Sequence, residues 1–63
     1  MHFIIYRDQK SEWRWLFRAA NNETIAVSSE GYTRRENALH SIALVKQGAP
    51  TAKTYDDTSK SWL

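Results

Sequence analysis

Trp13-Arg14-Trp15-Leu16-Phe17-Arg18-Ala19 is the stretch of sequence that decides the fold. Its side chains alternate in character, with Trp13, Trp15, Phe17 and Ala19 on one face of an extended chain and Arg14, Leu16 and Arg18 on the other. Such alternation is typical of an antiparallel sheet with one buried face and one face in contact with water. It predicts a central strand from Glu12 to Ala19, with the aromatic face turned toward the core.

Two segments on either side predict the neighbouring strands. Residues Phe3 to Arg7 are rich in aromatic and β-branched side chains, and residues Thr24 to Ser29 place Ile25 and Val27 on one face. The connections between the segments are short and polar, and Asn21-Asn22 suits the left-handed conformation of a tight turn. We therefore expect a three-stranded antiparallel meander.

A helix is predicted next, from about Arg34 to Gln47. Thr33 and Glu36 have the spacing of a capping box at its start. Gly48 suits the position just after the helix, and Pro50 prevents its continuation. The apolar stripe that would face the sheet consists of Ala38, Leu39, Ile42 and Val45. Before the helix, Gly31 is expected to supply a positive φ or a close approach of two backbone segments.

The rest of the chain is polar and less informative. Lys53-Thr54-Tyr55 predicts a short strand, and residues 57–63 predict a frayed polar tail that carries Trp62. We expect one domain over residues 1–63, with an ordered core over about residues 2–56. Strands grouped before a helix indicate the α+β class. The predicted core consists of Trp13, Trp15, Phe17, Ala38, Ile42 and Val45.

The small size of the chain raises the question of what stabilises it. Ordering 63 residues costs on the order of 95 kcal/mol, and without cysteine neither disulfides nor thiolate metal sites help. Aromatic residues make up 13% of the chain, and each buries roughly 150–250 Å². Oligomerisation is the other means by which small domains become stable, so we expect a second copy to contribute.

Composition also restricts the function. Nine Lys and Arg against seven Asp and Glu give a net charge of +2, too small to indicate nucleic-acid binding by itself. No apolar run is long enough to cross a membrane, and the first residues lack the pattern of a signal peptide, so we expect a cytoplasmic protein. No pattern of ligands indicates a metal or a cofactor.

Four short motifs resemble those of one known family: Tyr6, Trp13-Arg14-Trp15, Ala19-Ala20-Asn21 and Ser29-Glu30-Gly31-Tyr32. Together with the apolar helix positions they make residues 3–50 similar to the YegP-like family, the small bacterial DUF1508 (UPF0339) proteins. The resemblance implies a β-β-β-α-β unit, two copies of which form a continuous sheet and exchange their C-terminal strands. For a single unit it implies a homodimer, with the exchanged strand near Ala52 to Asp56 after a Gly48-Ala49-Pro50 hinge. It implies no established biochemical activity.

Two basic features are candidate binding sites. Arg14 and Arg18, joined by Arg7 from a neighbouring strand, predict a basic face that would take phosphates or nucleic acid, although cross-strand ion pairs on a solvated face explain the same residues. The loop before the helix is the second candidate, because helix amides bind anions. A satisfied capping box explains that loop equally well. The residues of this loop site are Glu30, Gly31, Tyr32 and Arg34.

The remaining motifs have ordinary structural explanations. The aromatic face of the central strand has the character of a base-stacking platform, but the helix needs that same face as its core. Glu36 and His40 are four residues apart, which indicates a surface contact on the helix and not an acid–base pair with further partners.

The sequence thus predicts a fold more fully than a function. We expect a small non-enzymatic bacterial protein of unknown function that acts as a homodimeric structural or protein-interaction module. An unidentified protein partner would use the sheet edges or the helix face of His40 and Leu44. Weak nucleic-acid or anion binding through the arginine-bearing face is the alternative.

Overall fold

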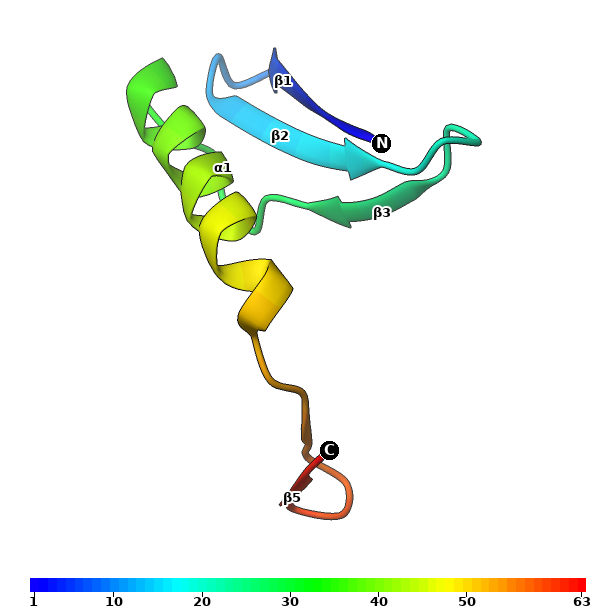
Figure 1. Ribbon diagram of the computed structural model, residues 1–63. Coiled ribbons are helices and arrows are strands. Elements are labelled where there is room, and N and C mark those ends of the chain that lie inside the picture. Colours follow the sequence, from blue (N-terminus) through cyan, green and yellow to red (C-terminus); the bar gives the residue numbers. More distant parts are fainter.

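A three-stranded antiparallel sheet forms most of the body of the protein, and the computed structural model describes residues 1–63. The strands follow one another in space as they do in sequence, with β2 in the centre (Figure 1). They are β1 (His2–Arg7), β2 (Trp13–Arg18) and β3 (Thr24–Val27). In the register of the sheet, Ile4 and Val27 lie opposite Leu16 on its two sides. The predicted meander is confirmed.

Local hydrogen bonds explain the two tight turns. In the first, the Asp8 carboxylate accepts from the backbone amides of Lys10 at 2.9 Å and Glu12 at 3.0 Å. In the second, Asn22 adopts a φ of 68°, the left-handed conformation that Asn tolerates. Short turns of this kind hold the strands in register, and so they determine which side chains share a face.

The chain continues beside β2 after β3 ends. Trp13 and Tyr32 exchange two backbone hydrogen bonds, of 2.7 and 2.8 Å. Beside this pair, Gly31 packs against Glu12. The approach is so close that a Cβ at Gly31 would lie 2.8 Å from the Cβ of Glu12. No glycine has a positive φ. Of the two expectations for Gly31, the close approach is therefore the one that holds.

The helix α1 (Arg35–Gly48) begins later than the sequence predicts. Arg34 is its N-cap, with extended φ and ψ of −110° and 139°, and no side chain caps the first turn. The predicted capping box of Thr33 and Glu36 is therefore wrong. The reason is tertiary: pairing of Tyr32 with β2 keeps the chain extended, and the first turn forms only beyond it.

The end of the helix also differs from the prediction. Gly48 has a φ of −91° and a ψ of −34°, so it belongs to the helix and does not occupy the left-handed position after it. The chain passes directly into the 3₁₀ turn η1 (Ala49–Thr51). Pro50 lies in the first turn of η1, where its missing amide leaves no hydrogen bond unmade.

The core is small and lies where α1 crosses the tryptophan face of β2. Its buried apolar residues are Trp15, Ala38 and Ile42. Trp13 and Phe17, which were predicted to belong to it, are half-buried. Val45 was also predicted to belong to it, but 38% of its surface is exposed because the C-terminal end of α1 extends beyond β3 (Figure 1). The buried core is thus smaller than the one that the sequence predicts.

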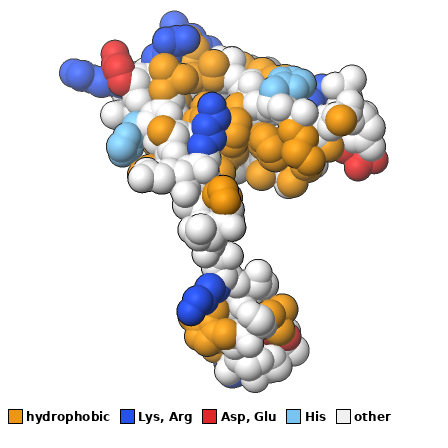
Figure 2. Space-filling view, in the orientation of Figure 1, with side chains coloured by type: hydrophobic (Ala, Val, Ile, Leu, Met, Phe, Trp, Pro, Cys, Tyr) orange, Lys and Arg blue, Asp and Glu red, His pale blue; other side chains and the backbone are white.

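The C-terminal residues form an arm that stands away from the body (Figure 1). The strands β4 (Tyr55–Asp56) and β5 (Ser61–Trp62) pair as a hairpin that contacts no other helix or strand. Figure 2 shows hydrophobic side chains on the body and again on the arm, with a narrow neck between them. Ser61 and Trp62 of the expected polar tail pair with β4 as β5 and remain exposed, and the α+β class is confirmed.

Candidate functional site

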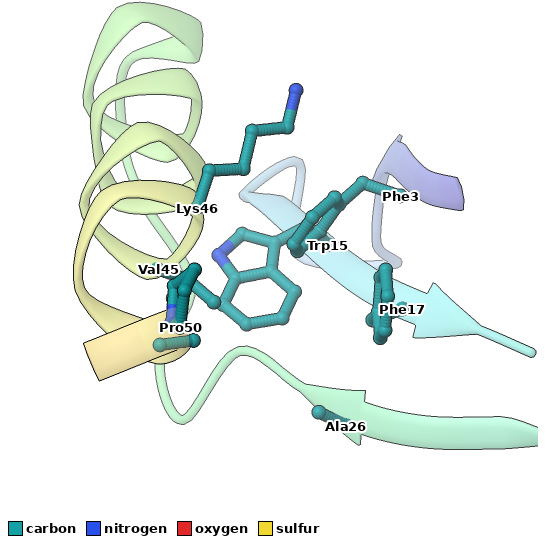
Figure 3. Close-up of a pocket in the computed structure, with 8 residues that line it drawn as sticks. Phe3, Trp15, Phe17, Ala26, Val45, Lys46 and Pro50 are labelled. Atoms are coloured by element: carbon teal, nitrogen blue, oxygen red, sulfur yellow. The ribbon is translucent and has the colours of Figure 1, made fainter. Parts of the chain in front are cut away.

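An apolar cleft opens between α1 and the sheet at the C-terminal end of the helix (Figure 3). Its volume is about 380 Å³. The residues that line it are Phe3, Trp15, Phe17, Ala26, Val45, Lys46, Ala49 and Pro50. The cleft adjoins the core, because Trp15 belongs to both.

One row of side chains across the sheet forms the floor of the cleft. Phe3 of β1 and Ala26 of β3 lie opposite Phe17 of β2. The ring centroids of Phe3 and Phe17 are 4.6 Å apart, and Trp15 meets Phe3 edge to face at 5.4 Å. Because Ala26 is small, the row leaves an open space at the β3 side that an apolar group from elsewhere would fill.

Lys46 contributes the positive charge at the rim of the cleft. Its Nζ lies 5.7 Å from the centroid of the Phe3 ring, a cation–π contact. The ion pairs of the chain are Arg14–Asp8 and Lys60–Asp57, so Lys46 has no carboxylate partner. The site is therefore suited to an apolar or aromatic group that is followed by an acidic one.

The three arginines of the predicted basic face do not lie together. Arg14 and Arg18 point from the face of the sheet that the helix leaves bare. Arg7, however, lies opposite Trp13 in the register of the sheet, with its guanidinium carbon 5.3 Å from the centre of the Trp13 ring. Including Arg7 in this face was wrong, because the turn at Asp8 sets a register that places it on the helix side.

Arg14 is also less available than the sequence suggests. Its Nε donates to the Asp8 carboxylate at 2.6 Å. This hydrogen bond lowers the pKa of Asp8 below its ordinary value and raises the pKa of Arg14. Arg14 and Asp8 therefore form a neutral pair, which leaves Arg18 as the unpaired charge on the bare face.

The bare face of the sheet carries an apolar row beside these charges. Ile4, Leu16 and Val27 lie side by side across the three strands, and 61% of Val27 is exposed. Leu16, unexpected between two arginines, thus belongs to this row.

The loop before the helix is not organised as an anion site. Gly31 and Tyr32 serve the packing against β2 described above, Arg34 is the N-cap, and Glu30 is exposed. It is the neighbouring Arg35 that reaches Trp13, with its guanidinium carbon 5.8 Å from the ring centre. The sequence alone does not reveal this pairing of Arg7 and Arg35 around Trp13, because it depends on the register of the sheet and the start of the helix.

Glu36 and His40 are exposed and form no ion pair with each other. Three or more His, Cys, Asp or Glu side chains do not come together anywhere in the structure in a way that would hold a metal ion. None of its helices has the length and apolar character needed to cross a membrane.

A helix on one face of a three-stranded meander, an open apolar cleft and a separate C-terminal hairpin together define a small α+β protein with a small buried core. The sequence profile of the domain of unknown function DUF1508 matches residues 8–56. The chain belongs to this family, whose curated relatives are named UPF0339 proteins.

Known proteins resemble the chain over most of its length. A UPF0339 protein of Neisseria meningitidis serogroup B is 50% identical over 46 residues, which are 73% of this chain and 80% of the relative. A UPF0339 protein of Agrobacterium fabrum is 42% identical over 57 residues, or 90% of both chains. The NMR solution structure of a protein from Haloferax volcanii has a TM-score of 0.81 and 33% identity, covering 87% of this chain and 92% of that one. The fold is thus shared with a solved structure.

Proposed function

We propose that the protein is a non-enzymatic structural or protein-interaction module that acts in the cytoplasm as a homodimer. In the dimer each chain lays its arm, residues 52–63, on the body of the other chain, residues 1–51. The observation that carries this proposal is the separation of the arm: its hairpin contacts no helix or strand of its own body, while that body has an open apolar cleft.

The dimensions of the single chain support a shared fold. Its radius of gyration is 13.8 Å, whereas a compact domain of this length has about 11 Å. Its accessible surface is 5179 Å², whereas a compact protein of 7.4 kDa exposes about 4,200 Å². Summed over two chains, the surface exposed in excess of that of two compact proteins is about 2,000 Å². This area is within the range that stable protein interfaces bury.

The topology offers a place for the exchanged strand. Because the order of the sheet is β1-β2-β3, both β1 and β3 have a free edge. An extended segment of a second chain, near Ala52 to Asp56, can pair with such an edge through backbone hydrogen bonds. Exchange of an identical element is a low-cost way to form a dimer, since each chain gives and receives the same contact.

Beyond the dimer, two surfaces are available to another protein. One is the outer face of α1, where Leu44 is 54% exposed beside His40. The other is whichever sheet edge the exchanged strand leaves free. We propose these as the surfaces for an unidentified protein partner.

The mass in solution tests the proposal directly. Sedimentation equilibrium at micromolar concentration is expected to give twice 7.4 kDa, and a compact monomer of 7.4 kDa would overturn the proposal. The radius of gyration is not a substitute for the mass. A compact dimer has about 14 Å, the same as the extended single chain. A chain cut after Gly48 is expected to be monomeric and less stable, because it lacks the arm.

Nucleic-acid or anion binding is the alternative function, and the geometry supports it less. Asp8 neutralises Arg14, and Arg7 lies on the opposite face from Arg14 and Arg18. A titration with single- and double-stranded oligonucleotides at low salt separates the two functions. The alternative requires binding that weakens as salt rises and that is lost in an Arg14→Ala, Arg18→Ala variant.

A further inference from the structure

The cleft and the arm carry complementary chemistry. We infer that the aromatic pair Tyr55–Trp62 of a second copy of this chain fills the cleft, and that the acidic turn next to the pair lies against Lys46. This inference rests on the proposed homodimer and goes beyond it by assigning the anchor residues. It also provides a role for Trp62, which lies beyond the part of the chain that the family profile matches.

The hairpin already holds the two rings in place. Tyr55 lies directly opposite Trp62 in the β4–β5 register, and their ring centroids are 4.9 Å apart at an angle of 66°. The Leu63 amide donates to the Thr54 carbonyl at 2.9 Å, which ties the end of the chain to the hairpin. Both rings are nevertheless largely exposed, Tyr55 by 44% and Trp62 by 65%. A rigid, exposed aromatic pair loses little freedom on binding and is typical of the anchor of an interface.

The cleft fits such an anchor in shape and character. Its floor is aromatic, and its helix side is formed by Val45, Ala49 and Pro50 (Figure 3). Aromatic rings prefer edge-to-face and offset contacts, which the Phe3–Trp15 pair already shows on this floor. An indole or phenol ring placed there would extend the cluster of Phe3, Trp15 and Phe17.

Charge supports the same orientation of the hairpin. Its turn carries Asp57, which is paired with Lys60, and Asp56, which has no cationic partner, while the rim of the cleft carries Lys46 without a carboxylate partner. Asp56 is ionised at neutral pH as an ordinary aspartate is, and hydrogen bonds from the Ser59 and Thr58 amides lower its pKa further. When the aromatic pair enters the cleft, this negative turn lies next to the positive rim.

The occupant is a second copy because of where the arm begins. Ala49 and Pro50 line the cleft and also lead into the arm, so the arm leaves the body at the mouth of its own cleft. Ala52 is extended, with φ and ψ of −68° and 137°. The segment that follows η1 runs away from the body (Figure 1). In a two-fold dimer, an arm that leaves one cleft arrives at the other, and both clefts are filled by the same contact.

Cysteine cross-linking tests the inference, because the natural chain has no cysteine. Val45→Cys chains and Leu63→Cys chains are refolded together and oxidised. A disulfide between the two kinds of chain is expected, since Val45 lines the cleft and Leu63 follows Trp62. The matched control pairs Leu63→Cys with Val27→Cys, a valine on the bare face of the sheet, and is expected to give at least tenfold less cross-linked dimer.

Each outcome distinguishes the inference from the proposed dimer. No cross-linking above the control, in a protein whose mass is that of a dimer, overturns the inference and leaves the dimer intact. A monomer mass overturns both. A chain with both substitutions that forms the disulfide within itself at high dilution shows that the arm folds back on its own cleft, which also overturns the inference. In chains without the introduced cysteines, Trp62→Ala is expected to weaken dimerisation at least tenfold. Trp62→Phe is expected to keep most of the affinity.

Discussion

At the scale of single residues, the two glycines have opposite requirements. A Cβ at Gly31 would meet the Glu12 side chain, including its Cβ at 2.8 Å, whereas a Cβ at Gly48 would enter open space at a helical φ of −91°. We predict that Gly31→Ala lowers the free energy of unfolding by about 1–3 kcal/mol through overpacking. Gly48→Ala is its matched control and is expected to raise the free energy of unfolding by up to about 1 kcal/mol. Urea denaturation at one protein concentration measures both.

The same pair of variants can contradict the structure. If Gly31→Ala were as stable as the wild type, the loop from Ser28 to Tyr32 could not lie as close to Glu12 as described. If Gly48→Ala were strongly destabilising, Gly48 would have a left-handed conformation after all, as the sequence pattern first indicated.

Asp8 connects the stability of the first turn to pH. Its carboxylate accepts from Arg14 Nε and from the amides of Glu12 and Lys10, and these bonds lower its pKa, the one from Arg14 having the largest effect. Because the pKa is lower in the folded than in the unfolded state, ionised Asp8 stabilises the protein above its ordinary pKa of about 3.9. That contribution is lost as pH falls through the folded pKa.

We therefore predict that the free energy of unfolding decreases as pH falls below about 4, and that Asp8→Asn reduces this decrease. Arg14→Gln removes the strongest of the bonds and should reduce the decrease in part. Asp56, whose pKa is also lowered, accounts for some of what remains. Chemical denaturation between pH 6 and pH 2 is the measurement, and identical slopes for Asp8→Asn and the wild type would contradict the role of the turn.

At the scale of elements, one polar contact holds α1 on the sheet. The buried Trp15 indole donates to Ser41 Oγ at 2.7 Å, and the Ser41 hydroxyl donates in turn to the Ala38 carbonyl at 2.7 Å. Removing the hydroxyl leaves the indole N–H without an acceptor. We predict that Ser41→Ala costs about 1–3 kcal/mol in the free energy of unfolding.

Ser41→Thr is the matched control for this contact, because it keeps a hydroxyl at the same position. It should lose less stability than Ser41→Ala in the same urea titration. Equal losses in the two variants would mean that packing at this position, and not the hydrogen bond, holds the helix.

The elements also show how far sequence reasoning reaches. Alternation over Trp13–Arg18 specifies a strand and its two faces, because the period of a strand is a local property. The turn residues Asp8 and Asn22 then specify which strands are neighbours in the sheet. The stripe of Ala38 and Ile42 specifies which side of α1 meets Trp15. These local patterns were sufficient for the sheet, the helix and the centre of the core.

The predictions from sequence failed where tertiary contacts override a local preference. Thr33 is a good N-cap by its residue type, yet the pairing of Tyr32 with Trp13 takes that part of the chain into the sheet. Arg7 was placed on the wrong face because the register of β1 depends on the exact turn. Val45 has the right helical spacing for the core, but the chain leaves 38% of its surface exposed. The candidate cleft follows from this exposure, which no pattern within the helix reveals.

At the scale of the whole molecule, the proposed homodimer makes stability depend on protein concentration. Trp15, Ala38 and Ile42 are the apolar side chains that one chain buries, and in the proposed homodimer the second chain adds burial that offsets the entropy of folding. If folding and association are one step, mass action makes the Tm depend on protein concentration. An unfolding enthalpy on the order of 90 kcal/mol per dimer corresponds to a rise in Tm of about 6 °C for each tenfold increase in concentration.

Thermal unfolding by circular dichroism at 5, 50 and 500 μM measures this dependence. The control is the oxidised, cross-linked dimer of Val45→Cys and Leu63→Cys chains, whose Tm should not change with concentration because its chains cannot separate. Adding a reductant to that dimer should restore the dependence. If the wild type had one Tm at all three concentrations and the mass of a single chain, the 63 residues would fold alone, and the open cleft would have to be stable without a second copy.

The same experiment on Trp62→Ala tests the residue that we assign as the anchor. The Tm of this variant should be lower than that of the wild type at every concentration, because the chain still folds with a partner but binds it more weakly.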